Sequence, residues 1–155
     1  MTTTPSCRIL LVEDDPNDAF FMERALGKTK LNPCLYVAKN GQEAINYLAG
    51  LGDFADRDRH PIPHAIFLDL KMPFMDGFQV LEWCRKQTSL ANVPVIVLTS
   101  SSEDRDRQRA FGLGATDYLV KPPRAPVLLD VLKAIPNCSP VAPGTDPPAS
   151  PSREN

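Results

Sequence analysis

The sequence predicts an α/β fold, (βα)5, in which five parallel strands form a doubly wound sheet covered by helices on both faces. Short apolar runs alternate with helical patterns five times along the 155 residues, which is typical of parallel strands joined by right-handed crossovers. The run 65–68 is apolar throughout, as expected for a strand buried on both faces. Polar residues follow several of these runs directly, where open α/β sheets bind ligands.

The first strand is expected at 8–12 and the first helix from Pro16 to about Lys28. Asp15 is a candidate N-cap and Pro16 occupies the favoured first helical position. We expect the adjacent Phe20 and Phe21 to pack rather than to bind a cofactor. Four residues at helical spacing are predicted to face the core: Ala19, Met22, Ala25 and Leu26.

A short strand is expected at 34–37, followed by a helix that opens at Asn40 with a capping-box pattern to Glu43 and closes at Gly50. Residues 53–64 form a long polar connection. Its His60 and His64 lie near three aspartates, but their spacing matches no defensible metal site. A solvated loop is therefore the better interpretation.

The remaining strands are expected at 65–68, 94–98 and 116–120, each followed by a helix, at about 77–86, 103–111 and 127–135. From residue 136 the composition becomes rich in proline and poor in large apolar side chains. Such a segment cannot bury enough surface to offset the entropy of ordering it. We therefore expect one domain over residues 7–135, a disordered N-terminus at 1–6 and a disordered tail at 136–155.

Charge and composition exclude several function classes. The formal net charge is −2 with no Lys/Arg block, so no nucleic-acid partner is expected. No apolar run is long enough to span a bilayer and no signal peptide opens the chain, so no membrane role is expected. The four cysteines are scattered without a Cys-x-x-Cys pair. This fits a reducing cytoplasm and predicts neither a disulfide nor a zinc site.

Five polar residues at strand ends form the candidate site: Glu13, Asp14, Asp69, Thr99 and Lys121. Each alone favours a helix cap or a surface position, but together at successive strand ends they favour one site. Two like charges about 4 Å apart repel by roughly 4 kcal/mol at an effective dielectric near 20. A Mg²⁺ ion, a raised pKa or the lysine could offset this repulsion. With Mg²⁺, one carboxylate could attack phosphorus and form an aspartyl phosphate.

The motifs at these positions resemble those of receiver domains of bacterial two-component response regulators, the CheY-like superfamily. They read Leu-Val-Glu-Asp-Asp, Leu-Asp-Leu-Lys-Met-Pro-Phe-Met-Asp-Gly, Val-Leu-Thr-Ser and Asp-Tyr-Leu-Val-Lys-Pro. The resemblance covers about residues 7–135 and implies a flavodoxin-like sheet of order 2-1-3-4-5. The long connection at 50–64 is similar to that of single-domain regulators paired with phytochrome-type histidine kinases.

The resemblance implies a metal centre and a phosphoacceptor. Asp69 would accept a phosphoryl group from a phosphohistidine. Glu13, Asp14 and Asp69 would hold Mg²⁺ together with the backbone carbonyl of Lys71. We also hypothesise that the Lys71 side chain alters the lifetime of the phosphoryl group, because it would border the hydrolytic water. Asp76 is expected to be structural.

The resemblance also implies a switch. Thr99, Ser100 and Lys121 would bind phosphoryl oxygens, and a cis peptide before Pro122 would aim the lysine inward. Tyr118 would swing inward as Thr99 moves. The face made by the fourth helix, fifth strand and fifth helix would then report the change.

The expected function is that of a single-domain response regulator in a phosphorelay, not an enzyme. Its partners would be a sensor histidine kinase or a histidine phosphotransfer protein, and a downstream protein target; a homodimer stays open. Alternatives are a phosphoryl sink or relay intermediate and a scaffold that is never phosphorylated. A haloacid-dehalogenase-type phosphohydrolase would need a second Asp where Lys71 stands. A flavodoxin-like nucleotide-binding module would need a Gly-rich loop after the first strand.

Overall fold

The computed structural model describes residues 7–138, in which five parallel strands form one sheet. The strands are adjacent in the order β2-β1-β3-β4-β5, which confirms the expected order. The first strand, β1, pairs with β2 on one side and with the central strand β3 on the other. The strands are β1 (Arg8–Val12), β2 (Cys34–Ala38), β3 (Ala65–Leu68), β4 (Val95–Thr99) and β5 (Asp117–Val120).

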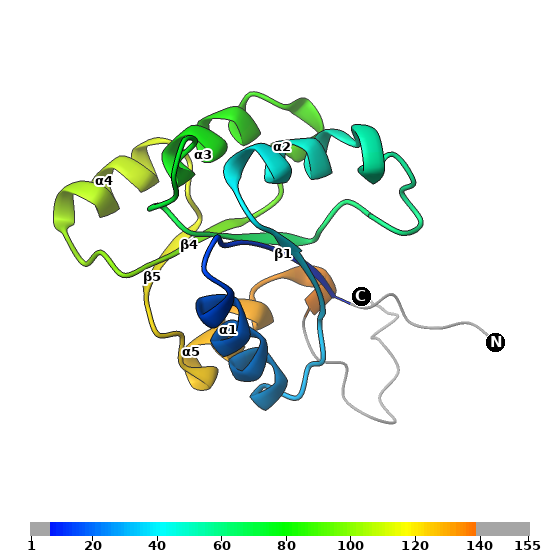
Figure 1. Cartoon of the computed structure of the whole chain (residues 1–155). Helices are drawn as coiled ribbons and strands as arrows, with labels where there is room; N and C mark the ends of the chain where they lie inside the picture. The colour runs from blue at the N-terminus through cyan, green and yellow to red at the C-terminus, as the bar shows by residue number, and fades with distance from the viewer. Residues whose placement is uncertain (1–6, 139–155) are drawn as a thin grey trace, which may run out of the picture.

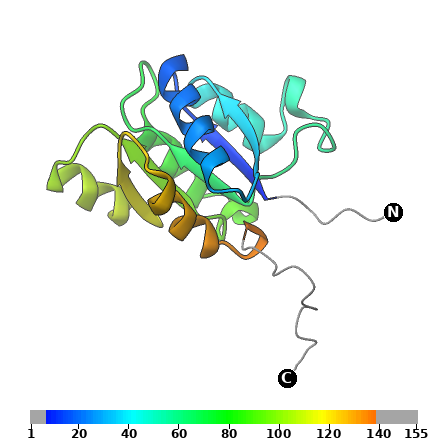
Figure 2. The same cartoon turned by 90° about the horizontal axis from the view of Figure 1, so that it is seen from below.

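The helices cover both faces of the sheet. In Figure 1, α2, α3 and α4 lie above the sheet and α1 and α5 lie below it. The view from below shows α1 and α5 over the same face (Figure 2). The helices are α1 (Pro16–Lys28), α2 (Gly41–Ala49), α3 (Gly77–Arg85), α4 (Asp104–Gly112) and α5 (Ala125–Lys133). Short 3-10 helices lie at Gly52–Phe54, Thr88–Leu90 and Pro136–Cys138.

The core has two layers because successive strand residues point to opposite faces. Ile66 and Leu68 of β3 pack in the layer beneath α2 and α3, whereas Phe67 packs in the layer of α1 and α5. Every residue of β3 and β4 is buried. The predicted burial of the β3 run on both faces is therefore correct, and it fixes the position at which Asp69 leaves the sheet.

Polar caps begin the helices near the sheet's carboxyl edge. The N–H of Asn17 donates to Asp15 Oδ1 at 2.8 Å, so Asp15 is the predicted N-cap of α1. Asp76 caps α3 in a complete capping box with Gln79, which confirms its structural role. Asn40 accepts from the N–H of Glu43 in α2, but the Glu43 carboxylate accepts from Lys39 rather than from Asn40.

The connection before β3 is packed rather than simply solvated. His64 is partly buried, and its Nδ1 accepts the backbone N–H of Arg8 at 2.9 Å. The His60 ring lies edge-on to Tyr47 and Phe54. The polar connection was predicted correctly, and its two histidines act here in packing and in hydrogen bonding.

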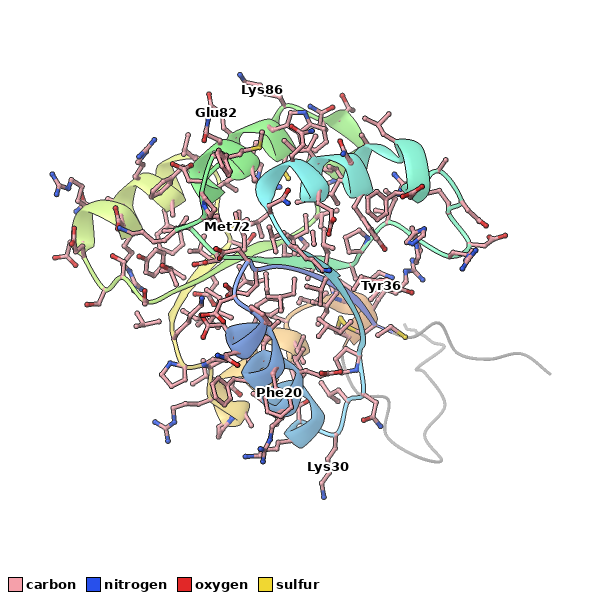
Figure 3. The ribbon with its side chains drawn as sticks, viewed as in Figure 1. Phe20, Lys30, Tyr36, Met72, Glu82 and Lys86 are labelled. Carbon is pink, nitrogen blue, oxygen red and sulfur yellow. A yellow bond between two sulfur atoms is a disulfide. The ribbon has the colours of Figure 1, made fainter. Side chains whose placement is uncertain are left out.

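The structure contains a disulfide that the sequence analysis did not predict. Cys7 at the start of β1 and Cys138 in the last 3-10 helix are bonded and buried, 131 residues apart in sequence. Figure 3 shows the side chains in place on the ribbon. Sequence spacing could not indicate this pair, because the sheet brings distant segments together. The predicted tail boundary is also corrected, since Pro136–Cys138 is helical. The disorder expected at 1–6 and 139–155 falls outside the described residues.

The packing expected for the aromatic pair on α1 is also wrong. Phe20 and Phe21 are each 52% exposed, and Figure 3 labels Phe20 on α1. Met22, Ala25 and Leu26 take the buried positions of this helix instead. The helical stripe was read correctly, and the two aromatic rings lie beside it. None of the helices within residues 7–138 has the length and apolar character needed to cross a membrane.

Candidate functional site

Three carboxylates meet at the carboxyl edge of the sheet. Glu13 and Asp14 follow β1, and Asp69 follows the neighbouring strand β3. The N–H of Asp69 donates to the carbonyl of Val12 at 3.0 Å, so the strand pairing itself places these acids side by side. One oxygen of each lies within 4.8 Å of the others. Glu13 and Asp69 are buried and Asp14 is exposed.

Lys121 places its ammonium among these acids. Its Nζ lies 2.6 Å from Glu13 Oε1, 2.8 Å from Asp18 Oδ2 and 3.6 Å from Asp69 Oδ1. The residue follows β5 and is joined to Pro122 by a cis peptide bond, as expected. The Lys121 side chain is only 13% exposed, so its charge acts on these carboxylates with little screening by water.

Burial favours the neutral form of each group in this cluster, whereas the oppositely charged groups nearby favour its ionised form. Burial raises the pKa of Glu13 to about 7, although its hydrogen bond to Lys121 opposes the rise. Burial also raises the pKa of Asp69, against the nearby charge of Lys121. Burial alone would lower the pKa of Lys121, but hydrogen bonds to Asp18 and Glu13 raise it. Burial therefore makes the ionised forms of Glu13 and Asp69 costly, and the Lys121 ammonium offsets part of that cost.

The hydroxyl residues lie at the end of β4, next to β3. Thr99 is fully buried, and its Oγ1 accepts the N–H of Ser101 at 3.3 Å. The N–H of Lys121 donates to the carbonyl of Thr99 at 2.8 Å. Ser100 lines a small cavity together with Lys121 and Asp18. The ends of β4 and β5 therefore lie beside the acidic cluster, as predicted.

Tyr118 and Lys71 lie on the periphery of this cluster. The Tyr118 ring is buried, and its hydroxyl donates to the carbonyl of Ser101 at 2.8 Å. Lys71 donates its backbone N–H to Asp69 Oδ1 at 3.4 Å. The Lys71 side chain is 63% exposed, with Nζ 3.7 Å from Asp106 Oδ2. The tyrosine thus occupies the inward position, while its swing and the metal-binding role of the Lys71 carbonyl stay predictions.

Two contributors to the site were missed from the sequence. Asp18, in the first turn of α1, was not among the predicted site residues, yet its carboxylate contacts Lys121. Because the two residues are 103 positions apart in sequence, no local spacing indicated this contact. Gly77, the first residue of α3, was not predicted to matter to the site either. A Cβ there would meet the carbonyl oxygen of Asp69 and lie 2.8 Å from Leu70 Cα.

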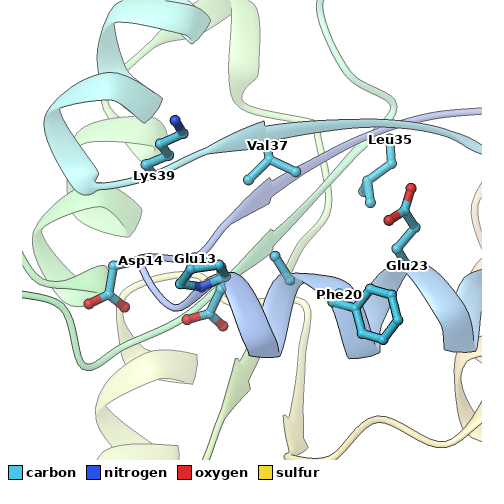
Figure 4. Close-up of a pocket in the computed structure, with 9 residues that line it drawn as sticks. Glu13, Asp14, Phe20, Glu23, Leu35, Val37 and Lys39 are labelled. Carbon is cyan, nitrogen blue, oxygen red and sulfur yellow. The ribbon is translucent and has the colours of Figure 1, made fainter.

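A groove of about 440 Å³ adjoins the acidic cluster along α1 and β2. Figure 4 shows Glu13 and Asp14 at the end of β1, with Phe20 and Glu23 farther along α1. Val37 and Lys39 of the β2 side form the opposite wall (Figure 4). The groove therefore connects the acidic cluster with solvent along α1.

Comparison with protein families decides the assignment. The family described as the response regulator receiver domain matches residues 9–133. The chain belongs to this family. Response regulators of this kind act in two-component signalling, and phosphorylation is typical of them.

The relatives include one curated response regulator and two solved structures whose titles name phytochromes. The chain is 31% identical over 119 residues to response regulator Rcp1 of Synechocystis, covering 77% of this chain and 79% of Rcp1. The structure of the bacteriophytochrome response regulator AtBRR is 35% identical with a TM-score of 0.75, covering 85% of this chain and 94% of AtBRR. The phosphorylated cyanobacterial phytochrome response regulator RcpA is 29% identical with a TM-score of 0.72, covering 84% and 91%.

Other curated relatives are much longer than this chain. It spans 26% of a probable cyclic di-GMP phosphodiesterase of Vibrio cholerae, with which it is 33% identical. This similarity concerns the receiver domain alone.

Proposed function

We propose that this chain is a phospho-accepting response regulator in which Asp69 takes a phosphoryl group from the phosphohistidine of a sensor histidine kinase. One observation supports this most strongly: three carboxylates lie within 4.8 Å of one another, with the Lys121 ammonium 3.6 Å from Asp69. An acidic cluster with a nearly buried ammonium suits a reaction that brings a phosphoryl group onto a carboxylate.

The donor set fits a hard divalent cation. Glu13, Asp14 and Asp69 offer only oxygen ligands, which suits Mg²⁺, and one solved structure similar to this chain is a Mn²⁺-bound form of Rcp1, 30% identical with a TM-score of 0.69. We propose that these three residues hold Mg²⁺, with the backbone carbonyl of Lys71 as a further ligand. When bound, the ion would neutralise charge on the phosphoryl oxygens.

The chain's own residues would perform the transfer as follows. A carboxylate oxygen of Asp69 attacks phosphorus, the bond from phosphorus to the imidazole nitrogen breaks, and the imidazole keeps the electron pair. Lys121 and the hydroxyl residues Thr99 and Ser100 bind the transferred oxygens. Because the Lys121 ammonium already lies 3.6 Å from Asp69 Oδ1, a phosphoryl group there would come within its reach.

The change would be reported on the face of α4, β5 and α5. Tyr118 joins this face to the site through the carbonyl of Ser101, and the Arg107 guanidinium lies 5.5 Å from the centre of its ring. Phe111, Val120 and Val127 expose apolar surface on these elements. We propose that this face binds a downstream protein or a second copy of the chain.

The names of similar proteins support a phytochrome-type kinase as the phosphodonor. A histidine phosphotransfer protein would present the same chemistry. Release of the group to a further carrier would make the chain a phosphoryl sink or relay intermediate. We place the receiver domain at about residues 7–138, because the last 3-10 helix and its disulfide pack onto the sheet, and we propose a cytoplasmic location. We also propose that the Lys71 side chain alters phosphoryl lifetime. Self-phosphorylation on Asp69 would not make the protein an enzyme in the usual sense.

Intact mass after incubation with acetyl phosphate tests this proposal. Wild type should gain one phosphoryl group only when Mg²⁺ is present, and Asp69→Asn should gain none. Asp76→Asn is a matched control, because this carboxylate caps α3 outside the acidic cluster. A wild type that stays unmodified with Mg²⁺ would favour the scaffold alternative.

A further inference from the structure

The Lys121 ammonium has three acidic neighbours, one of which lies outside the acidic cluster. An ammonium offers three N–H donors, and the carboxylates of Glu13, Asp18 and Asp69 surround this one at 2.6, 2.8 and 3.6 Å. Glu13 and Asp69 belong to the carboxylate trio. Asp18 projects from the first turn of α1 and is not one of those three carboxylates.

The three contacts differ in how long they can persist during the proposed reaction. A cation bound by Glu13 would compete with the ammonium for the same carboxylate, since both are positive. Asp69 would change from a carboxylate to an acyl phosphate. Asp18 takes part in neither event, so its hydrogen bond to Lys121 can persist throughout.

The surroundings of Lys121 leave room for its ammonium to move. A cavity of about 250 Å³ lies beside its side chain, with Phe21, Leu98 and Pro122 among its lining residues. A lysine has a flexible four-carbon stem, so a released ammonium could turn into this space. Asp18 also lines this cavity, and its hydrogen bond to Lys121 Nζ restricts such movement.

We propose that Asp18 is a positioning residue that keeps the Lys121 ammonium directed at the phosphoryl group on Asp69. This inference rests on the proposed function and adds a residue to it. Asp18 acts through Lys121 and does not itself touch the phosphoryl group.

Charge alone predicts the opposite effect of Asp18→Asn on phosphoryl-analogue affinity from the one that positioning predicts, so a binding measurement can separate the two. Removing one carboxylate near an anion-binding site lowers repulsion, so on charge alone Asp18→Asn would bind a phosphoryl analogue more tightly. If Asp18 holds the lysine in place, the same change weakens binding by about tenfold, the scale of one charge-assisted hydrogen bond.

The experiment measures binding of beryllofluoride, a phosphoryl analogue, with Mg²⁺ present, by fluorine NMR. Wild type, Asp18→Asn, Asp18→Ala and Asp18→Glu are compared. Glu23→Gln is the matched control, because it removes one exposed carboxylate farther along α1 (Figure 4). We expect about tenfold weaker binding for the Asn and Ala variants, partial recovery with Glu, and no weakening for Glu23→Gln. Equal or tighter binding by Asp18→Asn would overturn the proposal.

A second readout does not depend on phosphoryl binding. Side-chain nitrogen NMR of the Lys121 ammonium in the fluoride-free protein should give a sharp, slowly exchanging signal in wild type. The signal should broaden by exchange with water in Asp18→Asn and persist in Glu23→Gln. If wild type binds no beryllofluoride, the proposed function fails. An identical lysine signal with and without Asp18 refutes this inference in either case.

Discussion

Replacing Gly77 with alanine should damage both the fold and the site, because Gly77 lies against the backbone that carries Asp69. Its N–H donates to the carbonyl of Leu70 at 3.0 Å. An added Cβ would meet the carbonyl oxygen of Asp69 and lie 2.8 Å from Leu70 Cα. Both neighbours are main-chain atoms, so no side-chain rotation can relieve the contact.

The expected change in the free energy of unfolding is the difference between two effects. Overpacking at a close contact costs about 1–3 kcal/mol. Replacing glycine by alanine recovers about 0.4–1 kcal/mol through the unfolded chain. The two ranges leave a net loss of up to about 2.6 kcal/mol; since the contact is with main-chain atoms, we expect Gly77→Ala to lower the free energy of unfolding by about 1–2.6 kcal/mol, the upper part of that range. A displaced Asp69 should also slow phosphorylation, by roughly tenfold for a shift of a fraction of an ångström.

Gly27→Ala provides the matched control, because a Cβ at this position in α1 would have nothing within 4 Å. Chemical denaturation should show this variant to be slightly more stable than wild type, by up to about 1 kcal/mol. Its rate of phosphorylation by acetyl phosphate should match that of wild type. Equal stabilities and rates for the two alanine variants would refute the close approach of Gly77 to Asp69.

Three further predictions concern other parts of the chain. Cys138→Ser removes a cross-link across 131 residues and should lower the free energy of unfolding by about 2–5 kcal/mol without reductant; equal denaturation midpoints would contradict this. Burial lowers the pKa of His64 from 6.5. The stability that neutral His64 contributes is therefore present above about pH 6.5 and is lost as the pH falls below it. Melting curves should show wild type losing more stability than His64→Gln between about pH 7 and about pH 5. Parallel losses in the two proteins would count against this. Tyr118→Phe removes a buried hydrogen bond and should cost about 1 kcal/mol in denaturation, whereas an unchanged midpoint would show that this bond contributes nothing.

The sheet and most of the site could be predicted because each depends on local sequence. The apolar run before Asp69 is buried on both faces, so its end had to lie at the sheet's carboxyl edge. The caps at Asp15 and Asp76 follow from residue type and position. The resemblance to receiver domains supplied the strand order, and the pairing of β1 with β3 places Asp69 beside Glu13.

The missed features depend on tertiary contacts that leave little trace in local sequence. The Cys7–Cys138 disulfide joins the two ends of the described chain. The exposure of Phe20 is different, because the stripe of Met22, Ala25 and Leu26 sets the rotation of α1 and Phe20 lies outside that stripe, so the helical spacing itself indicated it. Asp18 acquires its partner only because the end of β5 brings Lys121 across from another part of the chain.

The most direct test of the account asks which carboxylate carries the phosphoryl group. Several acids lie close together, including Asp14 and Asp18, so a gain in mass alone does not identify the acceptor. Borohydride reduces an aspartyl phosphate to homoserine, which peptide sequencing by mass spectrometry can locate. After treatment with acetyl phosphate and Mg²⁺, the account predicts homoserine at position 69 and at no other aspartate. Homoserine at position 14 or 18, or its absence from a phosphorylated sample, would contradict it.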